Sequence, residues 1–234
     1  MQADMEQEYS ISPSTTVEKA NQRVRTFMNK VYLWMAVTLL VSAGAAAYAI
    51  ASPDLLFWVA ENYMISSFGC LALLLVMSFA SRSLSSATLG ALLIIFCAME
   101  GLLLGPLVSL IAPGTIVTAF ACTAGMFGVM SLYGACTKTN LGGIGRFLFM
   151  TLIGLIIAMI VNIFVASSMM SFIISGIGVV LFAAFTAYDT QMLRAMALEL
   201  DGEGREKGAI FGALALYLDF LNMFLFLLSL LRQD

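Results

Sequence analysis

Seven apolar segments, each about 20 residues long, constrain this chain more than any other feature of its sequence. A helix of that length crosses the hydrocarbon core of a bilayer. Only 11% of the 234 residues are charged and 61% are hydrophobic, which excludes an ordinary soluble domain, a disordered chain and a nucleic-acid-binding protein. The sequence therefore predicts an all-α integral membrane protein, a bundle of seven transmembrane helices. The predicted spans are residues 31–51, 63–80, 87–112, 115–135, 147–167, 171–189 and 209–231.

Short joints containing helix breakers connect these spans, so we expect one compact bundle and no second domain. Residues 1–30 are predicted to form a cytoplasmic tail and an interfacial amphipathic helix, because apolar residues recur at helical spacing from Val17 among several basic ones. Residues 31–231 are predicted to form the seven-helix transmembrane domain. The charged run at 199–207 is expected to be a solvated hairpin tip between the last two spans.

The basic residues are strongly biased to one side of the predicted bundle. Only Arg232 lies on the far side of the membrane from the N-terminus. Because basic loops remain in the cytoplasm, this bias predicts a cytoplasmic N-terminus and an external C-terminus. The other ten basic residues are Lys19, Arg23, Arg25, Lys30, Arg82, Lys138, Arg146, Arg194, Arg205 and Lys207.

Four ionisable residues lie at or near membrane depth, where a charge is costly and a function is the first hypothesis: Arg82, Glu100, Asp189 and Asp219. Glu100 is near the middle of the third span and precedes the small-residue pair Gly101 and Gly105. A relay or cavity-lining role and a purely structural hydrogen bond are both open for it. Arg82 either extends to the membrane interface or acts as a counter-charge to the aspartates.

Asp189 and Asp219 are expected at nearly the same depth. If the sixth helix continues to the Asp201–Gly204 turn, Asp189 lies about 16 Å above that turn and Asp219 about 18 Å above it, at 1.5 Å per residue. Whether the two side chains face each other depends on helix rotation, which spacing does not fix. Asn222 lies one helical turn after Asp219 and is expected to share its hydrogen bonds.

Two neighbouring carboxylates in a low dielectric cannot both be ionised cheaply, so one proton is expected to be shared between them. The chain has no histidine, which makes this pair its best available pH sensor. Carboxylate oxygens also suit Ca²⁺, although two carboxylates fall short of its usual coordination number. A structural role, with the aspartates bonded to backbone groups or to Arg82, is the alternative.

Four stretches of the sequence resemble the Bax inhibitor-1 family, also called the transmembrane Bax-inhibitor-motif family. The resemblance covers all seven spans, and the compact chain is similar to bacterial members. It is carried by Ala187-Tyr188-Asp189-Thr190-Gln191, by residues 213–222 around Asp219, by 149–162 and by 124–134.

The resemblance implies a bundle with a central, partly broken last helix, located in the bacterial inner membrane. It further implies a pH-sensitive Ca²⁺ leak in which Asp189 and Asp219 form the sensing and ion-binding pair and Arg82 is a latch. Calcium, protons and the lipid bilayer are then the expected partners, with Ca²⁺ as the permeant or bound ion and no other cofactor. Glu100 and Asn222 are possible pore or relay residues.

Two other functions compete with the leak channel. A non-conducting regulator that binds a membrane protease or channel would use a helix face that the sequence does not identify. An intramembrane aspartyl protease also carries a Tyr-Asp pair, as at Tyr188-Asp189, but its second aspartate follows Gly-x-Gly, whereas Asp219 follows Leu216-Tyr217-Leu218. The sequence therefore favours a protein that is not an enzyme.

Overall fold

In the computed structural model, residues 13–232 are described, and this part of the chain is helical with no strand. Seven of its helices are long and apolar enough to cross a membrane, as the sequence predicts. Residues 1–12 of the predicted tail lie outside the described residues. The helices are α2 Pro13–Ala51, α3 Pro53–Glu61, α4 Tyr63–Ala80, α5 Ser86–Ser109, α6 Pro113–Cys136, α7 Gly142–Val165, α8 Ser168–Glu199 and α9 Gly202–Leu231.

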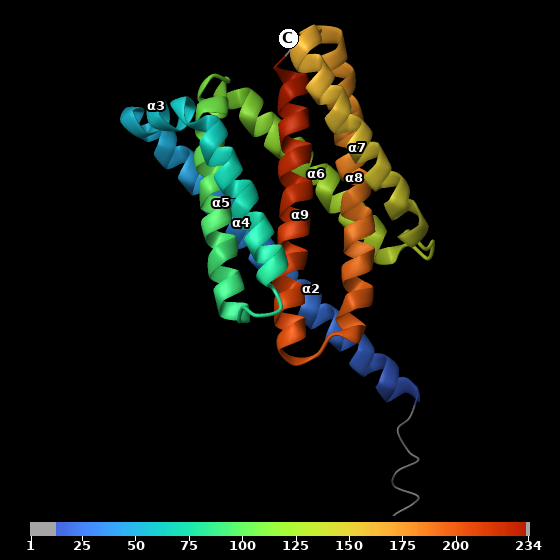
Figure 1. Ribbon diagram of the computed structural model, residues 1–234. Coiled ribbons are helices and arrows are strands. Elements are labelled where there is room, and N and C mark those ends of the chain that lie inside the picture. The colour runs from blue at the N-terminus through green and yellow to red at the C-terminus, as the bar shows by residue number, and fades with distance from the viewer. Residues whose placement is uncertain (1–12, 233–234) are drawn as a thin grey trace, which may run out of the picture.

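The last helix, α9, runs through the centre of the bundle (Figure 1). It packs against α2, α5, α6 and α8, and its Leu216, Tyr217 and Met223 are fully buried. The resemblance implies a partly broken last helix, and this expectation is wrong here: α9 is continuous from Gly202 to Leu231. It contains no proline, and its last glycine is Gly212, so the stretch from there to Leu231 has no residue that would kink the helix.

The first span is longer than the sequence predicts, because residues 13–30 and 31–51 form one helix, α2, of 39 residues. Its N-terminal part extends beyond the end of the bundle (Figure 1). The apolar residues Val24, Phe27 and Met28 are buried in the main core. The amphipathic stripe therefore packs against protein, with Phe27 beside Gly208 of α9, and not against lipid alone.

The short helix α3 was not predicted. Pro53 occupies its first turn, where the missing N–H costs no hydrogen bond. With 9 residues, α3 is too short to cross a membrane, and its Phe57 and Trp58 side chains are exposed. Exposed aromatic side chains at the end of a bundle are typical of the membrane–water interface.

Small residues bring α2 and α5 into close contact, as the Gly101 and Gly105 spacing predicts. A Cβ atom at Gly101 would lie 2.3 Å from the Ser42 carbonyl oxygen, and one at Gly105 would lie 2.8 Å from the Ala49 Cβ. Only glycine fits at Gly101, because the atom opposite it belongs to the backbone.

Candidate functional site

The two aspartates of the last helical hairpin line one cavity between α7, α8 and α9. Asp189 is on α8 and Asp219 is on α9, and both line a cavity of about 440 Å³ together with Asn222. Residue spacing does not fix the rotation of the two helices. In the structure, this rotation places both aspartates at the same cavity. The two carboxyl groups are close enough to interact directly.

The cavity is otherwise apolar. Its walls come from α7, α8 and α9, and none of the described residues that line it is basic. The rings of Phe182 and Phe226 stack with their centroids 6.0 Å apart and form part of its wall. Because α7 packs mainly on α8, space is left between α7 and α9.

Burial differs between the two aspartates. Asp219 is 5% exposed, and its Oδ2 atom has no hydrogen-bond partner in the described part of the chain. Asp189 is half-buried. Burying a carboxylate oxygen without a hydrogen-bond donor costs free energy. A proton or cation bound at Oδ2 would therefore stabilise the buried Asp219 side chain.

Asn222 lines the cavity, but it does not share hydrogen bonds with Asp219 as predicted. Its Nδ2 atom donates to the Leu218 carbonyl oxygen on its own helix, at 2.8 Å. The carbonyl one turn back is the nearest acceptor for an asparagine within a helix, which explains the difference. The Asn222 amide oxygen remains an acceptor at the cavity.

Glu100 lies elsewhere, on α5, and does not line the aspartate cavity. It is half-buried and is close to the thiol of Cys70 on α4. The structure therefore separates Glu100 from the aspartate pair. Its role as a pore or relay residue stays a prediction.

Arg82 is exposed in the turn between α4 and α5, and the described residues include no ion pair between it and either aspartate. This turn and the α8–α9 turn lie at the same end of the bundle (Figure 1). Asp189 lies eleven residues before Leu200, which corresponds to about 16 Å of helix above that end. The latch contact is thus absent in this conformation, and the latch role stays a prediction.

The comparisons with known proteins agree with these motifs. The sequence model of the family described as "Inhibitor of apoptosis-promoting Bax1" matches residues 24–234, which include all seven spans. The chain belongs to the Bax inhibitor-1 family.

Several similar proteins come from bacteria. An uncharacterized protein of Deinococcus radiodurans is 46% identical, over 92% of this chain and 94% of its own. The inner membrane protein YbhL of Escherichia coli is 39% identical, over 93% of this chain and 95% of its own. An uncharacterized membrane protein of Streptococcus pyogenes is 36% identical, over 70% and 71%. None of these three names describes an enzyme.

The family motif around Asp189 is also what fixes α8 in place. Tyr188 packs on Gly145 of α7, where an added Cβ would lie 2.5 Å from the ring. The Thr190 and Ser131 hydroxyl groups are 3.1 Å apart, which ties α8 to α6. Gln191 accepts from the Leu141 N–H at 2.7 Å and donates to the Thr139 carbonyl oxygen at 2.9 Å. The three neighbours of Asp189 thereby orient its carboxylate.

Tyr217 orients α9 in a comparable way. Its hydroxyl is 2.8 Å from the Ser42 hydroxyl on α2, and Ser42 also donates to the Cys97 carbonyl oxygen on α5 at 2.8 Å. Tyr217 and Asp219 are two positions apart on α9, and two positions correspond to about 200° of rotation around a helix. Since Tyr217 faces α2 and α5, Asp219 faces the opposite side, toward the cavity.

Sequence reasoning missed the packing of the α8–α9 turn. The run at 199–207 is expected to be solvated, but Arg23 of α2 forms an ion pair with Asp201 at 2.5 Å and donates to the Leu200 carbonyl oxygen at 3.3 Å. Lys30 of α2 forms a second ion pair with Glu206. We call these two ion pairs the hairpin clamp. Its signal in the sequence was the presence of opposite charges in two distant segments.

Proposed function

We propose that this protein is a pH-sensitive calcium leak channel gated by the Asp189–Asp219 pair. One observation carries the proposal: an intramembrane cavity brings together two carboxylates, of which Asp219 is buried with an unpartnered oxygen. Ionisable groups at this depth are rarely retained without a function. This site then conducts ions and does not catalyse a reaction.

The gating step is a competition between a proton and Ca²⁺ for the same oxygens. Two carboxylates in a water-poor site repel each other when both are ionised, so one proton shared between them stabilises the closed state. A divalent cation can replace that proton only after the proton leaves. Ca²⁺ flux is therefore expected to fall as the pH decreases.

The small number of ligands suits a permeating ion better than a resident one. The cavity offers the two carboxylates and the Asn222 amide oxygen, whereas Ca²⁺ prefers about 6–8 oxygens. Within the described residues, no group of three or more acidic, cysteine or histidine side chains is placed to hold a metal. Water would have to complete the shell, and weak binding lets an ion leave the site again.

We place the protein in the bacterial inner membrane with its N-terminus in the cytoplasm and its C-terminus outside. The seven spans and the bias of basic residues support this orientation. The relative YbhL is described as an inner membrane protein, which supports the location.

Calcium flux into liposomes that contain the purified protein tests the proposal. The wild type is expected to conduct Ca²⁺ with a clear pH dependence between roughly pH 6 and pH 8. Asp189→Asn and Asp219→Asn should each flatten that dependence, because either change removes the shared proton. The double variant should add little, since the two residues titrate as one unit.

Asp54→Asn is the matched control, because Asp54 is an exposed carboxylate on α3 and does not line the cavity. It should leave the pH dependence unchanged. A full pH response in the folded double variant would exclude the pair from gating. No flux from the folded wild type at any pH would favour the non-conducting regulator that binds a membrane protease or channel.

The latch proposal for Arg82 has its own test. If Arg82 pairs with the aspartates in a closed conformation other than the one described, Arg82→Ala should raise the leak at neutral pH. Unchanged flux from a folded Arg82→Ala protein would leave Arg82 as an interfacial residue, as its exposure in the turn already suggests.

A further inference from the structure

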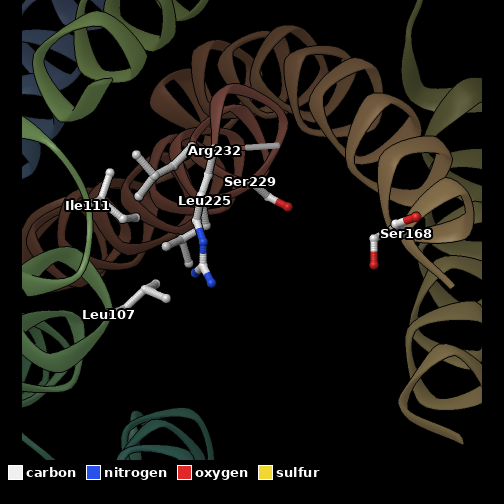
Figure 2. Close-up of a pocket in the computed structure, with 8 residues that line it drawn as sticks. Leu107, Ile111, Ser168, Leu225, Ser229 and Arg232 are labelled. Carbon is white, nitrogen blue, oxygen red and sulfur yellow. The ribbon is translucent and has the colours of Figure 1, made fainter. Parts of the chain in front are cut away.

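A second cavity, of about 500 Å³, lies at the end of the bundle opposite the α8–α9 turn. It is formed where α5 and α9 end and α8 begins. Arg232, three serines and four aliphatic residues line it, and Figure 2 shows the Arg232 side chain extending into the open space. This cavity shares no lining residue with the aspartate cavity.

The polar groups around this cavity are arranged as donors. The Ser229 hydroxyl oxygen accepts a hydrogen bond from the Ser175 hydroxyl at 3.0 Å, and the Ser171 hydroxyl oxygen accepts one from the Asn162 amide at 2.7 Å. Each serine therefore keeps its own O–H hydrogen to donate elsewhere. The guanidinium of Arg232 contributes donors and a positive charge, and it has no acceptor capacity.

The surroundings reinforce this preference for negative charge. Of the described residues that line the cavity, none is acidic. Ser168, another lining residue, is the first residue of the 32-residue helix α8, whose N-terminus carries a partial positive charge. Arg232, which is exposed, and the Ser171 and Ser229 hydroxyl groups are donors of the kind that bind phosphate oxygens, and the N-terminus of α8 favours an anion nearby.

The aliphatic side chains indicate which phosphate compounds fit. Leu107 of α5 and Leu225 of α9 lie on the membrane side of the arginine, within the two spans. We propose that this cavity binds a phosphate oxyanion at the end of the bundle, with the headgroup of an anionic phospholipid or free phosphate as its source. This site is independent of ion conduction by the aspartate pair.

Lipid binding to the purified full-length protein tests the site. Native mass spectrometry would follow titration with phosphatidylglycerol and, in parallel, with zwitterionic phosphatidylcholine. Arg232→Gln should weaken phosphatidylglycerol binding by about tenfold or more, because it removes a charge-assisted hydrogen bond worth roughly 1.5–3 kcal/mol. Ser229→Ala should weaken it less. Phosphatidylcholine should bind more weakly than phosphatidylglycerol to the wild type.

Arg146→Gln is the matched control, since Arg146 is an exposed arginine at the start of α7 and does not line the cavity. A second arm measures the thermal shift produced by inorganic phosphate. If phosphate stabilises the wild type but not Arg232→Gln, while both lipids bind both proteins equally, free phosphate is the source. If neither probe distinguishes Arg232→Gln from Arg146→Gln, the site does not exist. Neither result depends on calcium flux.

Discussion

Gly134 of α6 lies directly against the backbone of α8 at Ala187, two residues before Asp189. A Cβ atom at Gly134 would lie 2.2 Å from the Ala187 carbonyl oxygen. Because the opposing atom is backbone, Gly134→Ala must push the two helices apart. We expect it to destabilise the protein by about 1–3 kcal/mol, the usual cost of overpacking. Thermal unfolding of the protein in detergent would measure this loss.

The same helix supplies a control for this prediction. Gly125 also belongs to α6, and a Cβ atom there would meet nothing within 4 Å. Gly125→Ala should therefore cause no loss of stability, and its better helix propensity favours a gain of up to about 1 kcal/mol. Equal melting temperatures for the two variants would contradict the close contact between α6 and α8.

Among the helices, the hairpin clamp links the N-terminal part of α2 to the turn between the two helices that carry the aspartates. Arg23→Glu replaces the attraction to Asp201 with repulsion and also removes the hydrogen bond to Leu200. Since this ion pair is partly exposed, we expect a loss of only about 1 kcal/mol, and a smaller loss at high salt. Thermal unfolding at two salt concentrations would measure both effects.

Reversing the charge of Asp201 as well tests whether the lost stability can be recovered. Asp201→Arg combined with Arg23→Glu should recover part of the lost stability, because the attraction is restored with its sign exchanged. Arg25→Glu is the control, since Arg25 is an exposed neighbour on α2 with no ion pair to the described residues. If Arg23→Glu and Arg25→Glu lower the melting temperature equally, the clamp contributes nothing specific.

These elements also show what the sequence could and could not predict. The seven spans were predictable, because the thickness of the bilayer sets the length of the apolar segment that a helix needs to cross it. The equal depth of Asp189 and Asp219 followed from the rise per residue. Their shared cavity did not, because the rotation of α9 depends on contacts such as Tyr217 with Ser42, which join residues 175 positions apart. The hairpin clamp was missed for the same reason.

For the whole molecule, an odd number of spans places the two ends of the described chain at opposite ends of the bundle (Figure 1). The end with the hairpin clamp holds most of the basic side chains, and the other end holds Arg232. The proposed gate lies between these ends, in the aspartate cavity. The two ends therefore face opposite sides of the membrane. The orientation of the chain decides which of them faces the cytoplasm.

Cysteine labelling would determine that orientation. In a variant whose four native cysteines are replaced, single cysteines would be introduced at Gly114 and at Lys138, which lie at opposite ends of α6 and are both exposed. Because the basic residues favour a cytoplasmic N-terminus, a membrane-impermeant maleimide should label Gly114→Cys in intact spheroplasts. It should label Lys138→Cys only after permeabilisation. The reverse pattern would place the N-terminus outside, and labelling of both from one side would mean that α6 does not cross the membrane.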